Sequence, residues 1–368
     1  DRPCPVQPLH EISSCKSDSS NFSFDAASHS LTVHVRKQVR GQEFPGLDAL
    51  QPQVLSNAEM AHMEFDARRS VEHPYGLGYE RIPLPHAYMA MCASGRVPFV
   101  DVIDPTIMSL SERAMLAENL ESEKWDEGMY LDSYFDSDGE VAGVVRVEPL
   151  ILKREFLPHT MDATTPKAMP PFTEQSQALL IQVLFAYLYE MHVSLNDASS
   201  ESAWTICKLC RSIACFAEPW PQSNASSTMA EYVLHASYRR ALTYPLYRSW
   251  ALCAQVHKDL YSLLSKCDAK ARILHVLRDM DAIFALAPTG TGVPEPMEIV
   301  LQLIWDVWFA PLEVWVQTLT PEDIRALAST ILIPMSKADV GNPGDWDLDT
   351  LEWAAREAAD EGEIGGYV

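Results

Sequence analysis

The chain has 368 residues, enough for two or three domains with a sizeable core. Its formal net charge of −23, from 28 basic and 51 acidic residues, argues against direct nucleic-acid binding, because a phosphate binder needs a basic surface that releases counterions. The longest apolar run, near Ala178, is broken by Gln182 and is shorter than the roughly 20 residues of a membrane-spanning helix, and the amino terminus shows no secretory signal. We therefore expect a soluble intracellular protein that binds neither nucleic acid nor a membrane directly.

The amino-terminal part of the chain shows little regular pattern. Residues 1–23 are rich in Ser, Pro and Cys, and we expect a disordered leader there. Leu31, Val33 and Val35 alternate with polar residues, which predicts a half-buried strand within a partial β segment over 24–50. Because one or two strands cannot bury a core unaided, this sheet has either lost partner strands or docks on something else.

A mostly α-helical domain is predicted over 73–335, after a linker over 51–72. Its first helix is expected over 111–120 with Ser111 as N-cap, and the proline-rich stretch 158–173 predicts a flexible connection. The later helices are expected over 174–192, 200–216, 227–243, 245–264, 267–286, 296–309, 311–318 and 321–332. The fold class is therefore mostly α, an irregular multi-helix domain.

One of these helices is expected at the centre of the domain. Its apolar side chains recur at three- and four-residue steps and cover nearly the whole circumference: Leu184, Phe185, Tyr187, Leu188, Tyr189 and Met191. Ser200 is the expected cap of the next helix. Pro245, after Tyr244, is expected to break or kink the chain, because proline lacks an amide proton and clashes with the preceding turn.

Acidic residues gather in two stretches. Only Arg113 and Lys124 oppose the acids between Glu112 and Glu140. These acids include Glu118, Glu121, Glu123, Asp126, Glu127, Asp132, Asp136 and Asp138. The second stretch, 336–368, is expected to be an acidic tail with a frayed helix over 347–360. Such charge either maintains solubility or suits a basic partner through complementary fields.

Three motifs occur in one order along the helical domain. They are LFAYLYE (184–190), ESAW (201–204) followed by KL (208–209), and YPLYR (244–248). Together they resemble the Shq-one family, whose members are assembly chaperones for H/ACA ribonucleoproteins. The client of that family is the pseudouridine synthase dyskerin.

Three further stretches are similar to the family in the same order. HPYGLG (73–78) is similar to its Tyr-Gly-Phe-Gly motif, and VDVIDP (100–105) with the helix after it to its aspartate-rich segment. Residues 24–50 resemble the end of its amino-terminal CS domain, a β-sandwich. Residues 1–23 and 141–172 depart from the family pattern, so the resemblance implies only a remnant of a CS-like domain before the helical domain.

The resemblance implies a non-enzymatic chaperone that binds the RNA-binding face of a dyskerin-type pseudouridine synthase. In this role the acidic chain mimics RNA and occupies the RNA-binding face as a placeholder during assembly of small nucleolar ribonucleoproteins. We expect no cofactor and no bound metal, a monomer when free, and a location in the nucleus (nucleoplasm) and cytoplasm. The principal alternative is a CS-type co-chaperone of a heat-shock chaperone.

The motifs also supply candidate site residues. The expected partner-binding residues are Asp101, Asp104, Glu118, Glu121, Glu201 and Arg248. The expected structural residues of the motifs are Tyr75, Gly76, Gly78, Trp204, Tyr244, Pro245 and Tyr247. Asp101, Asp104 and the acids of 118–138 are the candidate RNA-mimicking surface.

Patterns that point to catalysis are few. Cys207 and Cys210, two of eight cysteines, form a CxxC that suggests a metal or thiol enzyme, but no second pair follows and the helical context favours buried thiols. Asp101 and Asp104 suggest paired carboxylates, although their place before Pro105 favours acids that hydrogen-bond within a turn. An aromatic stripe, Trp305, Trp308, Phe309 and Trp315, predicts either core packing or a partner groove.

Overall fold

The computed structural model describes residues 21–25, 30–34, 73, 75–77, 84, 88, 97, 99–102, 104–136, 139–156, 173–220, 227–286, 296–341 and 346–360. The chain forms two units, residues 1–67 and residues 68–368. The predicted fold class is confirmed for the second unit, whose described part is mostly helical.

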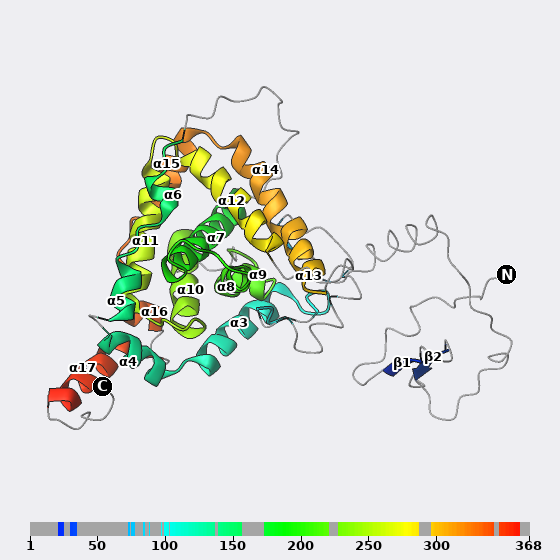
Figure 1. Cartoon of the computed structure of the whole chain (residues 1–368), viewed down its shortest axis with the longest axis horizontal. Coiled ribbons are helices and arrows are strands. Elements are labelled where there is room, and N and C mark those ends of the chain that lie inside the picture. The colour runs from blue at the N-terminus through cyan, green and yellow to red at the C-terminus, as the bar shows by residue number, and fades with distance from the viewer. Residues whose placement is uncertain are drawn as a thin grey trace. The chain divides into compact units, whose positions relative to one another are not determined.

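A two-stranded antiparallel sheet lies in the first unit (Figure 1). β1 (Asn21–Asp25) pairs with β2 (Ser30–His34), and Phe22 lies opposite Val33 in the register. The strand predicted from alternation is confirmed in β2, whereas β1 begins inside residues 1–23, where we expected disorder. A strand this short shows too little alternation to be recognised without its partner. The CS-like character of the segment stays a prediction, and the rest of the leader, the β segment and the linker lies outside the described residues.

Helix α7 (Thr173–Val193) lies in the middle of the second unit, with α8 (Ser202–Leu209), α10 (Met229–Thr243) and α11 (Trp250–Ser265) around it (Figure 1). Nearly all of its side chains are buried, even the polar Gln182, so the predicted central helix is confirmed. Each fully buried Leu or Phe contributes about 1.5–3 kcal/mol of transfer free energy. This helix therefore forms the axis of the core.

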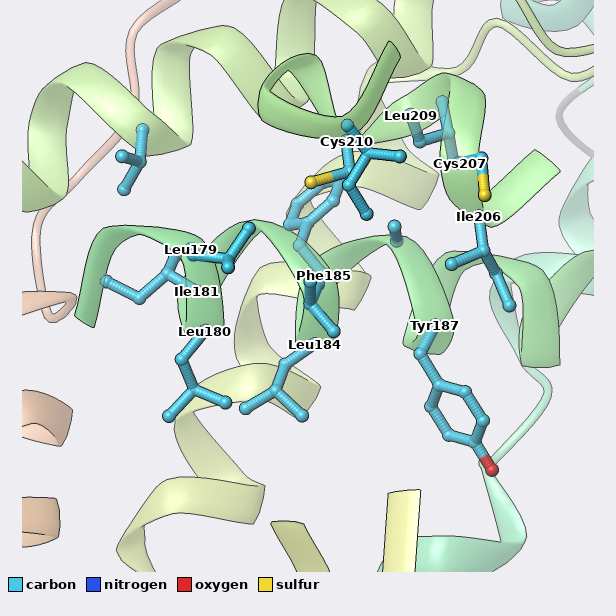
Figure 2. Packing of buried hydrophobic residues seen from close by; sticks show 14 of the residues in the cluster. Leu179, Leu180, Ile181, Leu184, Phe185, Tyr187, Ile206, Cys207, Leu209 and Cys210 are labelled. Carbon is cyan, nitrogen blue, oxygen red and sulfur yellow. The ribbon is translucent and has the colours of Figure 1, made fainter. Parts of the chain in front are cut away.

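The CxxC segment is part of the same core. Figure 2 shows Ile206, Cys207 and Cys210 among the apolar side chains of α7, and all three are fully buried. The helix does not continue through the motif, because α8 ends at Leu209 and Cys210 is extended. The predicted helix over 200–216 was therefore too long.

The other helices surround these elements. Their bounds are α3 Leu110–Lys124, α4 Glu127–Phe135, α5 Glu140–Val145, α6 Leu150–Lys153, α9 Arg211–Ala214, α12 Ala269–Ala285, α13 Pro296–Ile304, α14 Ala310–Thr318, α15 Pro321–Thr330, α16 Lys337–Gly341 and α17 Leu348–Asp360, with a π-helix, η3, over Trp305–Phe309. The predicted helices are confirmed with shifted ends, apart from the one over 200–216.

Three predicted helix starts differ from the structure, either in the first helical residue or in the capping residue. Helix α3 is capped by Ser109 rather than Ser111, because Ser109 and Glu112 form a reciprocal capping box. Helix α11 begins only at Trp250, capped by Ser249, so the break after Tyr244 is longer than expected. Helix α8 has no side-chain cap, and Ser200 has no capping role there.

The chain reverses after α7 through two residues with left-handed backbone. Leu195 and Asn196 have φ of 55° and 64°, a region that asparagine tolerates better than most residues. The amide of Asn196 donates to Met191 and closes the helix end. Its side-chain oxygen accepts from the amide of Leu150 at the start of α6, so one residue terminates one helix and caps another.

The predicted Tyr-Gly motif packs against the π-helical turn η3. Pro311 lacks the amide proton that would bond to Val307 in an α-helix, so the Val307 carbonyl is free to accept from Leu77 at 2.8 Å. Gly76, with φ of +85°, lies so close that a β-carbon would stand 2.8 Å from that same oxygen. Tyr75 is buried, and its ring contacts Phe216 edge-on.

The aromatic stripe belongs mostly to the core. Trp308 is 1% exposed and Trp315 is 2% exposed, whereas Trp305 is half-buried and stacks on Phe309. Glu298–Thr318 is long and apolar enough to cross a bilayer by length and composition, but 56% of its most apolar window is buried inside the protein. This segment is therefore buried to the extent typical of a helix that packs on the core.

The carboxyl-terminal segment packs on the domain instead of fraying. Trp346 is 4% exposed and stacks on Trp125 with ring centres 4.4 Å apart. Glu352 in α17 is buried and accepts from the hydroxyl of Tyr130 in α4 and from Lys337. The prediction of an acidic helix is confirmed over Leu348–Asp360. The acidic tail expected over 336–368 thus contains two packed helices, α16 and α17.

The contact at Gly76 makes a testable prediction. Gly76→Ala is expected to cost ~2 kcal/mol or more of the free energy of unfolding, because it combines a left-handed backbone with a backbone clash. Gly143→Ala is the matched control, because a β-carbon at this exposed position in α5 meets nothing within 4 Å. It should be neutral or stabilise by up to ~1 kcal/mol. Urea titrations of both variants measure the difference, and equal effects would contradict this account of Gly76.

Candidate functional site

The fold around α7 brings together motifs that are far apart in the sequence. ESAW and KL lie on α8, and YPLYR follows α10, yet their side chains line one hollow of about 250 Å³. Its lining residues, which we call the motif pocket, are Phe99, Trp204, Thr205, Lys208, Leu209, Tyr244 and Pro245. The LFAYLYE motif contacts the same region, because Tyr189 in α7 donates to the carbonyl of Tyr247 at 2.7 Å.

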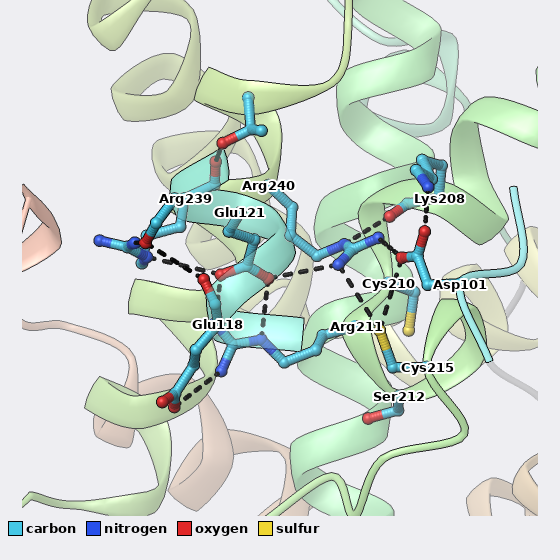
Figure 3. A network of polar contacts seen from close by, with 12 residues as sticks. Asp101, Glu118, Glu121, Lys208, Cys210, Arg211, Ser212, Cys215, Arg239 and Arg240 are labelled. Carbon is cyan, nitrogen blue, oxygen red and sulfur yellow. Dashed lines mark hydrogen bonds and ion pairs between the residues drawn. The ribbon is translucent and has the colours of Figure 1, made fainter. Parts of the chain in front are cut away.

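Buried charges lie beside the motif pocket. The arginine–carboxylate cluster consists of Asp101, Glu121, Lys208, Arg211, Arg239 and Arg240 (Figure 3). Its side chains come from the segment before α3 and from α3, α8, α9 and α10. Their exposed fractions range from zero at Glu121 and Arg240 to 19% at Lys208.

Glu121 is the centre of this cluster. Its Oε1 accepts from Arg211 at 3.0 Å and from Arg240 at 3.2 Å, and its Oε2 lies 3.4 Å from Arg239. A carboxylate this deep is tolerated only because the guanidinium groups replace its lost hydration. Three arginines from α9 and α10 are thereby tied to α3.

Asp101 forms the second half of the cluster. Its carboxylate bonds Lys208 and, at 3.0 Å, Arg240, while its backbone amide donates to Ala214 at 2.7 Å. Burial by itself raises the pKa of this carboxyl, but Arg240 and Lys208 outweigh it and hold the pKa below its usual range. Asp101 is therefore a charged, structural member of the site.

The cluster also reaches the carboxyl-terminal helices. Arg239 donates to the carbonyls of Val340 at 2.9 Å and Gly341 at 3.1 Å, and its guanidinium lies 4.0 Å from the ring centre of Trp346. The segment around α16 is therefore held by the same arginines that hold α3.

The CxxC thiols have a different environment. Burial raises the pKa of Cys210 to about 12 and that of Cys207 well above its usual value, so both are protonated thiols at neutral pH. Cys215 likewise has its pKa raised to about 12, chiefly by burial. Within the described part of the chain, no group of three His, Cys, Asp or Glu side chains is arranged to hold a metal ion.

The model of the SHQ1 protein, Shq1 domain, matches residues 167–341. Protein SHQ1 homolog from Caenorhabditis elegans is 29% identical over 70% of this chain and 57% of that protein, and its counterpart from Xenopus tropicalis is 26% identical over 90% of this chain and 59% of that protein. The resemblance of the chain to the SHQ1 family is therefore confirmed.

This is the family that the sequence resembles, and the three motifs lie inside the matched range. Protein shq1 from Schizosaccharomyces pombe, 26% identical, matches over 47% of this chain and 40% of its own length. The chain spans somewhat over half the length of the first two relatives named above.

The expected partner-binding residues lie in four different environments. Asp101 and Glu121 are buried in the arginine–carboxylate cluster, so little of either carboxylate is accessible to a partner. Asp104 accepts from the amide of Thr106 at 2.9 Å and from its hydroxyl, which confirms it as a hydrogen-bonding acid of a turn.

The remaining three of these residues lie elsewhere. Glu118 has an exposed side chain, 56%, at 3.7 Å from Arg211, and Glu201 is exposed before α8. Arg248 is largely buried, and its Nε donates to the carbonyl of Pro245. The six expected contacts therefore do not form one surface.

Several of the expected structural motif residues lie near one another. Trp204, Tyr244 and Pro245 meet in the motif pocket, and Tyr247 beside them donates its hydroxyl to Glu140 in α5. Gly78 lies outside the described residues.

Sequence reasoning did not identify the arginines of the cluster. Arg239 and Arg240 stand in an otherwise apolar stretch of α10, and this was the one local signal that they are buried. Their carboxylate partners are more than 100 residues away in the chain, so no local pattern joins them to Glu121.

Removal of the Glu121 charge tests the cluster. Glu121→Gln is expected to destabilise the fold by roughly 3–5 kcal/mol, because it leaves buried guanidinium groups without their carboxylate. Glu118→Gln is the matched control on the same helix, and its exposed pair should be worth under about 1 kcal/mol. Chemical denaturation of the two variants distinguishes these values.

The lowered pKa of Asp101 makes a prediction about pH. A carboxyl whose pKa falls on folding stabilises the fold above its ordinary value near 3.8 and loses that contribution as the pH falls through the lower folded value. The stability advantage of the wild type over Asp101→Asn should therefore be full at neutral pH and shrink below about pH 4. Thermal unfolding at a series of pH values measures it, and a constant advantage down to pH 2 would contradict this account.

Proposed function

We propose that the chain is an assembly factor that binds the RNA-binding face of a dyskerin-type pseudouridine synthase. It holds this protein soluble and free of RNA, as an RNA mimic and placeholder, during assembly of H/ACA small nucleolar ribonucleoproteins. The observation that carries the proposal is the similarity to the SHQ1 family, together with the strongly acidic composition.

The acids that support RNA mimicry are those on the outside of α3 and α4. The exposed carboxylates there are Glu112, Glu118, Glu123, Asp126, Glu127 and Asp132. Buried Glu121 faces the arginines of the cluster and so turns the opposite side of α3 to solvent. A row of carboxylates on a rigid helix produces the negative field that a basic RNA-binding face attracts.

The acids therefore have two roles. Asp101 and Glu121 position α3, and the exposed acids of α3 and α4 contact the basic partner. No chemistry is proposed at the CxxC, because its buried thiols are protonated. We propose a monomer when free, in the nucleus (nucleoplasm) and cytoplasm, with no cofactor.

A second candidate is a CS-type co-chaperone of a heat-shock chaperone. The β1–β2 hairpin in the first unit favours it, since a CS domain is a β-sandwich. The two functions differ in their partner. Binding to a heat-shock chaperone, without binding to the synthase, would favour the second.

Co-purification with the dyskerin homologue of the same source tests the first function. We expect a stable complex that excludes H/ACA RNA and that weakens as salt rises, because its attraction depends on complementary charge. A ternary complex with RNA would contradict the placeholder mechanism.

Charge reversal locates the contact. The triple variant Glu118→Lys, Glu123→Lys, Glu127→Lys should bind roughly tenfold or more weakly and with less dependence on salt. The control triple Asp281→Lys, Asp306→Lys, Glu322→Lys makes the same change in net charge at exposed positions outside α3 and α4. Equal losses in both triples would point to net charge alone, and no loss in the first would remove α3 and α4 from the interface.

A further inference from the structure

The motif pocket holds hydrogen-bond donors that the fold itself does not use. The indole Nε1 of Trp204 and the hydroxyl of Tyr244 are buried atoms without a hydrogen-bond partner. A buried polar group left unpaired costs about 1–3 kcal/mol, so a fold rarely retains two of them in one hollow without use. Both are suited to an acceptor that enters the pocket.

Positive charge gathers at the same place. The Lys208 ammonium lies 4.4 Å and the Arg240 guanidinium 4.5 Å from the ring centre of Tyr244. Lys208 is the most exposed member of the arginine–carboxylate cluster, at 19%. Four cations of the cluster face two buried carboxylates and the half-exposed Glu118, so positive charge is in excess although the chain as a whole is strongly acidic.

The walls and the size of the pocket limit what enters it. Phe99, Leu209 and Pro245 supply apolar surface to the pocket. The volume of about 250 Å³ is below the ~300–1,000 Å³ of typical small-molecule and cofactor sites. A side chain with an apolar stem or neighbour and a charged acceptor at its end matches these features.

We propose that the motif pocket binds an acidic side chain, Asp or Glu flanked by apolar residues, from a segment of a protein partner. The carboxylate accepts from the Trp204 indole and the Tyr244 hydroxyl and lies near Lys208, while neighbouring apolar residues cover Phe99 and Pro245. This site is independent of the acidic surface of α3 and α4 and of the basic partner proposed for it, because it selects the opposite charge.

The first experiment uses the full chain with 15N-labelled tryptophan and the probe peptide acetyl-Ala-Leu-Glu-Leu-Ala-amide. The indole signal of Trp204, assigned from its loss in Trp204→Phe, is expected to shift and to saturate. The same peptide with glutamine in place of glutamate should bind at least tenfold more weakly, since bonds to charged acceptors are the stronger ones. Equal binding of the two peptides, or no saturable shift, would overturn the proposal.

Sodium acetate provides the second arm. If acetate saturates the same shift at the same concentration as the glutamate peptide, the pocket takes a free small anion and the proposed peptide site is wrong. A peptide that binds much more tightly than acetate supports a contribution from the apolar walls.

Two variants test the donors without disturbing the ion pairs. Tyr244→Phe removes one donor that has no partner in the free protein, so the melting temperature should stay unchanged or rise. Trp204→Phe also removes part of a ring that packs on the core, so a lower melting temperature is expected there. Each should weaken the labelled glutamate peptide roughly tenfold in fluorescence anisotropy, and the glutamine peptide much less. Tyr261→Phe and Trp353→Phe, at exposed rings elsewhere, are the matched controls. Unchanged peptide binding in both pocket variants would overturn the assignment.

Discussion

The packing of the helical unit depends on the burial of Glu121 among arginines. Its carboxylate joins α3 to α9 and α10, and Arg239 extends the connection to the carboxyl-terminal helices. Desolvation of so many charges cancels much of their attraction, so the cluster contributes less to net stability than to specificity. An arrangement that displaced α3 would leave several buried charges unpaired, and this penalty selects one packing.

The apolar core supplies the stability that the cluster does not. Helix α7 is covered on all sides, and the helices after it contribute their apolar faces to the same cluster of side chains. Pro311 shows how a local rule shapes this packing: it opens a π-helical turn, and the freed carbonyl of Val307 receives Leu77. Gly76 is required there because no β-carbon fits.

The site combines this rigid frame with unsatisfied groups. Lys208 and Arg240 connect the cluster to the ring of Tyr244, so the pocket adjoins the arginine–carboxylate cluster. The indole of Trp204 and the hydroxyl of Tyr244 have no hydrogen-bond partner beside it. The buried charges thus pre-organise a polar hollow, while the exposed acids of α3 and α4 remain available for a basic surface.

The sequence by itself determined the helical class, the central helix, most helix positions and the family, because periodicity, caps and motif order are local features. It also placed Trp204 and Tyr244 in motifs that proved to share a site. Only the tertiary structure decided which acids are buried, since the partners of Glu121 lie about 90 to 119 residues away. A carboxylate on a helix has the same local pattern whether it faces water or an arginine, and three-dimensional packing alone distinguishes the two.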